Sequence, residues 1–266
     1  MTDWLALCRE AVEDVLGVLE ELPTRAEREP VVGDGEGGDE TTAVDAAAEQ
    51  VILARLQEVE GTTIVSEEVG IVGDGPTRIV VDPIDGSLNA KRGIPFFSVS
   101  IAVAEGDTMD DVVFGFVHDF GSGEEFTAVR HDGARLNGHE IRALGPGYGL
   151  ELVGLEASKP ELIAPLVDGL QGNAYRVRAL GSMALTLCYV AAGRLDGMIA
   201  ARPTRSVDVA AAQLIVREAG GVIKFDPHDL ADVHLDLAAR YHLAAALDEE
   251  MLGTLLHIQR KAASAT

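Results

Sequence analysis

The sequence contains little cysteine, little lysine and no long apolar run, and each shortage excludes a class of protein. Its two cysteines, Cys8 and Cys188, both fall in helix-like patterns, which excludes a disulfide framework as the basis of the fold. The longest apolar stretch, 96–104, is too short to span a bilayer and is interrupted by serines. The first residues lack the basic start and apolar block of an export signal. We therefore expect a soluble cytoplasmic protein without a membrane partner.

Positive charge is also scarce. The chain has 21 Lys and Arg residues against 44 Asp and Glu residues, a formal net charge of −23. Such a chain is repelled by nucleic acids and anionic membranes, so neither is expected as a partner. Lysine occurs at only four positions while arginine is used freely, and this combination suggests adaptation to a salt-rich, halophilic cytoplasm. Most acids then serve to hydrate the surface, and any catalytic acid has to be identified by its neighbours.

The length and apolar content allow a substantial core. The chain has 266 residues, of which 47% are hydrophobic, and neither an internal repeat nor a long linker divides it. Residues 1–148 are rich in strand patterns, whereas strands and helices alternate over 149–266. This order predicts an α+β fold of stacked helix and sheet layers, in a single domain spanning 1–266.

The predicted elements follow from periodicity and turn residues. Helical spacing predicts helices over 4–22, from Thr41 or Thr42 to about Gln57, and over 160–170, 181–192 and 207–219. The glycine-rich acidic segment 30–40 predicts a mobile loop. Short β-rich runs predict strands at 62–66, 78–82, 97–104, 112–118, 125–130, 153–157, 175–178 and 196–200.

The most informative segment is Asp82-Pro83-Ile84-Asp85-Gly86-Ser87, which directly follows the apolar run 79–81. Pro83 keeps Asp82 extended, so both aspartates can turn toward one point at the end of a strand. Gly86 lets the backbone approach a ligand, and N–H groups after it can face an anion if a helix begins there. The segment has the layout of a metal and phosphate site, although alone it is equally compatible with an acidic turn.

Other acids also stand where a predicted element begins or ends. Asp45 lies in the first turn of the second helix, Glu67 and Glu68 follow a strand, and Asp208 begins the helix at 207–219. Carboxylates at such positions can converge, and oxygen ligands without a His or Cys cluster favour Mg²⁺ or Mn²⁺ over zinc. Each has a plainer interpretation as well: a helix N-cap for Asp208, dipole stabilisation for Asp45, and a solvated turn for the glutamates.

Three motifs, in order and at matching spacing, resemble the inositol monophosphatase family. They are Val65-Ser66-Glu67-Glu68, the segment 81–87, and Val207-Asp208-Val209-Ala210-Ala211 followed by Glu218-Ala219-Gly220-Gly221. The resemblance runs from about Asp39 to Gly221 and is greatest to the archaeal enzymes that hydrolyse both fructose 1,6-bisphosphate and inositol 1-phosphate. It implies an αβαβα sandwich, a Mg²⁺-dependent phosphatase of carbohydrate metabolism and gluconeogenesis, and a homodimer.

The resemblance also implies roles for single residues. Glu67, Asp82, Asp85, Asp208 and the Ile84 carbonyl would be metal ligands. Asp45 and the Ser87 hydroxyl would position and deprotonate the attacking water, whose pKa the metal lowers. The N–H groups of Gly86 and Ser87 would hold phosphate, Gly181 and Ser182 would contact substrate hydroxyls, and Glu68 would orient the site.

The substrate expectation rests on Arg202 and Arg205. Animal enzymes of the family carry a substrate-binding glutamate in this stretch, whereas this chain has two arginines, whose fork geometry suits a second phosphate. Fructose 1,6-bisphosphate is therefore expected as the principal substrate and inositol 1-phosphate as a second one. Alternatives are surface ion pairing of the arginines, a 3′-phosphoadenosine 5′-phosphate nucleotidase, and a non-catalytic phosphate-ligand-binding protein. With 5% aromatic residues, the sequence shows no obvious pocket for a base.

Overall fold

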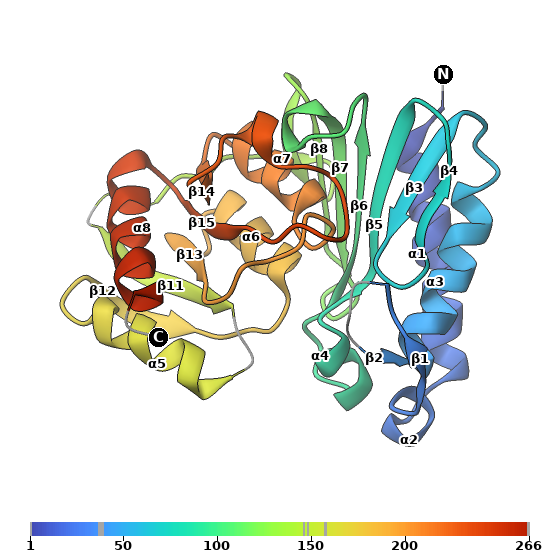
Figure 1. Cartoon of the computed structure of the whole chain (residues 1–266), viewed down its shortest axis with the longest axis horizontal. Helices are drawn as coiled ribbons and strands as arrows, with labels where there is room; N and C mark the ends of the chain where they lie inside the picture. The colour runs from blue at the N-terminus through green and yellow to red at the C-terminus, as the bar shows by residue number, and fades with distance from the viewer. Residues whose placement is uncertain (1, 37–39, 146, 148, 157–158, 265–266) are drawn as a thin grey trace.

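Five layers of helices and sheets build the molecule. The computed structural model describes residues 2–36, 40–145, 147, 149–156 and 159–264. From right to left in Figure 1, helices α1 and α3 cover one face of a large sheet, α6 and α7 lie between the two sheets, and α5 and α8 cover the outer face of the smaller sheet. This arrangement confirms the predicted α+β layered sandwich.

The large sheet has eight strands in the order β10-β9-β8-β7-β6-β5-β3-β4. Only β3 and β5 run parallel among these neighbours. Its strands are β3 (Thr62–Ser66), β4 (Gly70–Gly73), β5 (Thr77–Asp85), β6 (Ser98–Ala104), β7 (Val112–Asp119), β8 (Glu125–Val129), β9 (Gly133–Leu136) and β10 (His139–Ile141). The helices on its outer face are α1 (Trp4–Glu21) and α3 (Ala43–Leu56).

The smaller sheet has five strands in the order β12-β11-β13-β15-β14. Strand β11 runs parallel to both β12 and β13, while β15 is antiparallel to β13 and β14. The strands are β11 (Leu150–Glu156), β12 (Ala174–Arg178), β13 (Gly197–Ala200), β14 (Val222–Asp226) and β15 (His242–Ala246). The helices are α5 (Pro160–Leu170) and α8 (Glu249–Ala263) outside, and α6 (Met183–Ala191) and α7 (Ala210–Glu218) inside.

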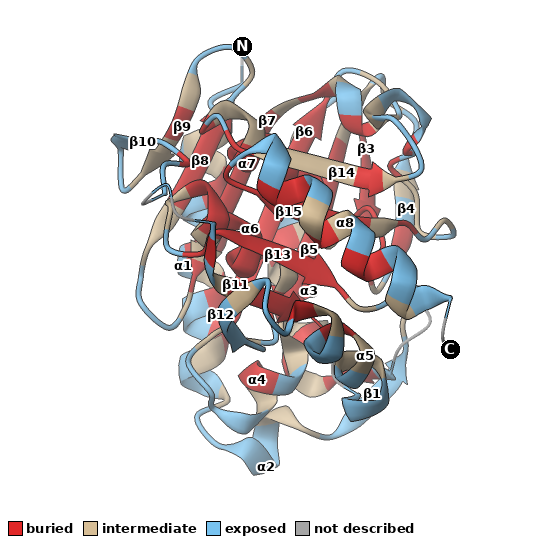
Figure 2. Ribbon diagram, turned by 90° about the vertical axis from the view of Figure 1, so that its left-hand side faces the viewer, coloured by how far each residue is buried: buried red, intermediate tan, exposed pale blue. Residues whose placement is uncertain are grey.

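The large sheet separates two apolar cores, as the alternation along β6 shows. Val99, Ile101 and Val103 belong to the core under α1 and α3, whereas Ala102 and Ala104 belong to the core between the sheets. Figure 2 shows the result: the central strands of both sheets are buried, while the edge strands and the outer helices carry exposed residues.

The inner face of the large sheet is lined with small residues where α7 crosses it. Ala102 on β6 pairs with Gly115 on β7, and a Cβ added to Gly115 would lie 2.6 Å from the Ala211 carbonyl oxygen. Small residues thus let α7 approach the sheet closely, which fixes the position of the turn before the helix.

The structure corrects several sequence predictions. The segment predicted as a loop over 30–40 contains β1 (Val31–Asp34), paired antiparallel with β2 (Glu40–Thr42); residues 37–39 lie outside the described residues. Helices α6 and α7 begin later than predicted. The predicted strand at 153–157 begins earlier, at Leu150, and its last residue also lies outside the described part. Elements that the sequence analysis did not assign are α2 (Arg25–Arg28), α4 (Ser87–Arg92), β4, β9, β10, β14, β15 and α8.

None of the helices within the described part of the chain combines the length and apolar character needed to cross a bilayer.

The contact between Gly115 and α7 predicts the effect of one added methyl group. Gly115→Ala should lower the free energy of unfolding by about 1–3 kcal/mol, because the Ala211 backbone cannot move aside as a flexible side chain would. The matched control is Gly17→Ala on α1, where a Cβ meets no atom within 4 Å and should stabilise the helix by roughly 0.5–1 kcal/mol. Urea denaturation of both variants checks this, and equal stabilities would contradict the close packing.

Candidate active site

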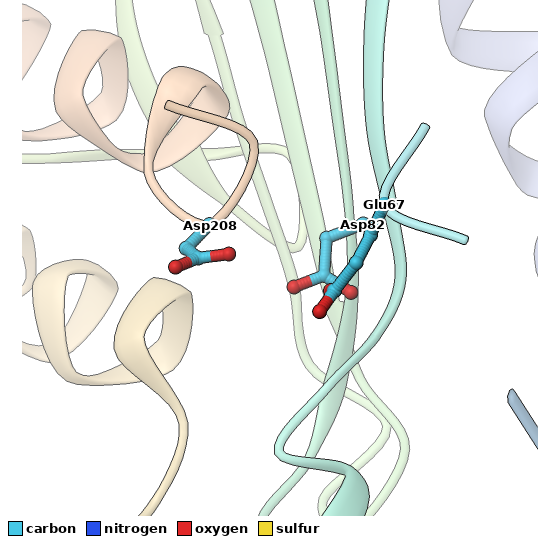
Figure 3. Close-up of side chains that lie close together, drawn as sticks. All are labelled: Glu67, Asp82 and Asp208. Carbon is cyan, nitrogen blue, oxygen red and sulfur yellow. The ribbon is translucent and has the colours of Figure 1, made fainter. Parts of the chain in front are cut away.

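Three carboxylates converge where the large sheet faces the inner helices. Glu67 follows β3, Asp82 lies in β5, and Asp208 lies in the turn before α7. One oxygen from each lies within 4.8 Å of the others, and the side chains point toward one another from opposite sides of the gap in Figure 3. The structure therefore brings together three of the acids named as metal ligands in the sequence analysis, and their role as ligands stays a prediction.

Asp208 does not cap α7, although the sequence analysis placed it at the start of that helix. The N-cap is Val209, and Asp208 belongs to the preceding turn. Its Oδ2 accepts hydrogen bonds from Thr204 Oγ1 at 2.8 Å and from the Arg205 N–H at 3.3 Å. These local bonds hold the carboxylate toward Asp82 instead of toward the helix end.

Strand β5 changes its pairing register between Asp82 and Asp85, and this irregularity presents both aspartates on the inner side. The Ile84 N–H donates to Asp82 Oδ1 at 3.1 Å. Gly86 follows with a φ of 98°, and a Cβ there would lie 3.0 Å from the Gly181 carbonyl oxygen. Glycine is therefore required for both the left-handed backbone and the close approach.

Asp85 points to the N-terminus of α6 and is not part of the three-carboxylate cluster. Its oxygens accept hydrogen bonds from the Ser182 hydroxyl, from the Ala184 N–H at 2.7 Å and from the Met183 N–H at 3.0 Å. Burial raises the pKa of Asp85 to about 6, while these donors act against the rise. Ser182 thus positions Asp85 in this structure, and contact of Gly181 and Ser182 with substrate stays a prediction.

Asp45 has one oxygen in use and one without a partner. Its Oδ2 accepts from the Thr42 N–H at 3.1 Å and the Thr42 hydroxyl at 2.5 Å, closing a capping box at the start of α3. Its buried Oδ1 has no hydrogen-bond partner among the described residues. Burial raises the pKa of Asp45, and the nearby Ser87 hydroxyl and Lys91 oppose that rise. Ser87 Oγ itself donates to the Ile84 carbonyl at 3.0 Å.

The two arginines proposed for substrate binding have different surroundings. Arg205 is buried, with its guanidinium 2.5 Å from Glu67 Oε1 and 3.1 Å from Asp208 Oδ1. Arg202 is exposed and forms no ion pair with a described residue. The structure therefore places Arg205 within the acidic cluster and leaves Arg202 accessible.

The electrostatics of the cluster favour a bound cation. Burial raises the pKa of Asp82 well above its ordinary value, and the charges of Glu67, Asp85 and Asp208 raise it further, while the charge of Arg205 acts against them. The donor set consists of carboxylate oxygens, and Asp45 Oδ1 is an additional buried oxygen without a partner. These residues fit a hard divalent cation such as Mg²⁺.

Three buried or half-buried glutamates support the site. Glu49, one helical turn after Asp45, accepts from the Ser66 hydroxyl and from the Val69 N–H at 3.0 Å, and so holds the turn that carries Glu67. Glu68 accepts from the Thr41 hydroxyl, consistent with its predicted orienting role. The sequence analysis missed Glu49, although its spacing of four from Asp45 places both on one helix face.

Glu156, at the end of β11, was also missed. It accepts from Thr186 Oγ1 at 2.6 Å and from the Gly181 N–H at 3.2 Å, and so fixes the start of α6, where Asp85 is also held. Burial raises the pKa of Glu156 to about 7. Nothing in its sequence neighbourhood distinguishes it from the many surface acids.

The raised pKa of Glu156 predicts a pH-dependent stability. The folded chain holds this proton more tightly than the unfolded chain, so stability falls as the pH rises from the ordinary value of 4.5 to about 7. Glu156→Gln, which keeps an acceptor without the charge, should stabilise the protein by roughly 2 kcal/mol at about pH 8 and by almost nothing near pH 4. Denaturation curves at both pH values check this. The exposed Glu151→Gln on the same strand is the control, and a pH-independent difference would contradict the assignment.

Comparison with known proteins agrees with this geometry. The sequence model of the inositol monophosphatase family matches residues 5–263, beyond the stretch that the sequence motifs mark. The fructose-1,6-bisphosphatase/inositol-1-monophosphatase of Thermococcus kodakarensis is 38% identical over 231 residues, 86% of each chain. The protein of the same name from Archaeoglobus fulgidus is 33% identical over 96% of this chain and 98% of its own.

A solved structure gives the same result. A protein described as an inositol monophosphatase–fructose 1,6 bisphosphatase superposes with a TM-score of 0.86 at 29% identity, covering 97% of this chain and 100% of its own. The chain belongs to the inositol monophosphatase family and is a metal-dependent phosphoric monoester hydrolase.

Proposed function

We propose that the protein is a Mg²⁺-dependent phosphatase that releases inorganic phosphate from fructose 1,6-bisphosphate, and from inositol 1-phosphate as a second substrate. The observation that carries the proposal is the convergence of Glu67, Asp82 and Asp208, and the buried Asp45 Oδ1, which has no hydrogen-bond partner among the described residues, adds to it. The names of the relatives from Thermococcus kodakarensis and Archaeoglobus fulgidus support this substrate pair.

One group of residues would bind the cation that hydrolysis requires. Glu67, Asp82 and Asp208 would hold the cation, with Asp85 and the Ile84 carbonyl as further ligands. A divalent cation there stabilises the charge that develops on the phosphoryl group and lowers the pKa of water.

Asp45 would accept the proton of the attacking water through Oδ1, and Ser87 would orient that water. Burial raises the pKa of Asp45 toward the pH at which the enzyme works, and a general base is most effective when its pKa is near that pH. The water oxygen would form the new bond to phosphorus, while the bond between phosphorus and the ester oxygen breaks. The ester oxygen would then leave and take up a proton. The N–H groups of Gly86 and Ser87 would hold the phosphate.

No protein nucleophile is needed. Cys8 and Cys188 are both buried, and burial raises the pKa of both thiols, so neither supplies a thiolate. Direct attack of water beside the acidic cluster requires neither thiol.

We further propose a cytoplasmic homodimer with one phosphatase domain over 1–266, working in gluconeogenesis at high salt. The charge of −23 supports the saline setting, because screening by salt weakens repulsion between surface acids. The deciding experiment is phosphate release from fructose 1,6-bisphosphate, inositol 1-phosphate and 3′-phosphoadenosine 5′-phosphate, side by side with Mg²⁺ at molar salt. Faster release from the nucleotide would favour the nucleotidase, and no release from any ester would favour a binding protein.

Asp82→Asn should separate activity from stability. Phosphate release should fall about a hundredfold or more, because a central charged ligand is lost. The metal-free variant should nevertheless be more stable than the native protein, because burial and three like charges disfavour the charged form of a carboxyl group at position 82 and raise its pKa, a cost that the neutral amide avoids. Turnover assays and denaturation in EDTA measure both, with the exposed Asp74→Asn as control. A variant with native turnover would remove Asp82 from the site.

Arg202→Gln tests the proposed contact with a second phosphate. The KM for fructose 1,6-bisphosphate should rise about tenfold with little change in kcat, because a charged contact to a non-reacting group is lost. The KM for inositol 1-phosphate, which has a single phosphate, should stay the same. The exposed Arg142→Gln serves as control, and an equal change for both substrates would argue against the contact.

A further inference from the structure

The guanidinium of Arg205 occupies an unusual position for an arginine of this protein. Its side chain is 10% exposed, and it contacts two of the three clustered acids, Glu67 and Asp208. The other described arginine ion pairs are more exposed, with arginine side chains from 29% exposed at Arg217 to 70% exposed at Arg142. Arg205 is thus a buried positive charge placed against the proposed ligands of a cation.

Arg205 uses the same oxygens that a divalent cation would need. Its NH2 group meets Glu67 Oε1 at 2.5 Å and its Nε meets Asp208 Oδ1 at 3.1 Å. Buried acids that lie this close repel one another strongly unless a cation lies among them. Without a metal ion, the guanidinium supplies that charge.

The hydrogen bonds that hold Asp208 Oδ2 do not involve the Arg205 guanidinium. The Arg205 N–H and Thr204 Oγ1 both hold Asp208 Oδ2, so the turn stays fixed whether or not the guanidinium remains in place. A rotation of the long side chain would release Oδ1 of Asp208 and Oε1 of Glu67 together.

We propose that Arg205 is a resident counter-cation that competes with the divalent ion for Glu67 and Asp208 and leaves at least one of them when the ion binds. The proposal rests on the proposed function, because it concerns the same site. It has two consequences. The metal-free chain keeps its acidic pocket folded, and the affinity for Mg²⁺ is lower than the number of acids alone would give.

Calorimetric titration of Mg²⁺ into protein stripped with EDTA tests the competition without an activity assay. Arg205→Gln keeps polar hydrogen-bond donors but removes the charge, and should lower the Kd for Mg²⁺ about tenfold. The control is Arg142→Gln, an exposed arginine paired with Glu140 outside the acidic cluster, which should leave the Kd for Mg²⁺ within about twofold. Arg205→Gln should also lower the Tm of the metal-free protein, and this loss should shrink at saturating Mg²⁺.

The direction in which Arg205→Gln changes the Kd for Mg²⁺ distinguishes competition with the metal ion from a purely structural role of Arg205. Equal or weaker Mg²⁺ binding by Arg205→Gln, or an equal loss of Tm with and without Mg²⁺, would overturn the proposal. If the variant does not fold, a crystal structure of the native protein with Mn²⁺ decides: both Arg205 contacts unchanged would overturn it, and at least one broken contact would support it.

Failure of this inference differs from failure of the proposed function. A native protein that releases phosphate, with a Kd unchanged in Arg205→Gln, would overturn the counter-cation role alone. A native protein that binds no Mg²⁺ would overturn both.

Discussion

Repulsion between buried carboxylates is the constraint around which this site is built. The negative charges of three acids, Asp82, Asp85 and Asp208, repel one another where little water is present to screen them. Burial and this repulsion raise the pKa values of Asp82 and Asp85. Separate donors hold each acid in place: the Ile84 N–H for Asp82, the start of α6 for Asp85, and Thr204 for Asp208. The site therefore stores electrostatic free energy that a bound cation releases.

The layered fold supplies the rigidity that this arrangement needs. The small residues Ala102 and Gly115 bring α7 close to the large sheet, so that Asp208 meets acids from the other side of the gap. On the outer side, α3 contributes Asp45 and Glu49 one turn apart. The site thus joins three successive layers, and a shift of any one layer would separate the oxygens by more than a metal ion tolerates.

The sequence allowed the principal acids and the layer order to be predicted, because both depend on local patterns. Strand ends mark Glu67 and Asp82, and alternation of strands with helices marks the second half of the chain. It did not reveal that Asp85 turns to α6, that Glu156 supports the same helix, or that Arg205 enters the cluster. Each of these depends on side-chain direction and on partners 25 to 138 positions away, which spacing does not encode. The strands β1 and β2 were missed because a glycine-rich composition resembles a loop.

Burial distinguishes the functional acids from the rest of an acidic chain. Among 44 Asp and Glu residues, most lie where solvent and salt screen them, and their charges are nearly interchangeable. The acids of the site are screened far less, so their charge interactions persist at salt concentrations that screen the interactions between surface charges. For the same reason we expect a single buried arginine to affect metal binding more than the whole surface charge does. On this argument the local balance between Arg205 and its neighbouring acids, and not the net charge of −23, sets the affinity of the site for a cation.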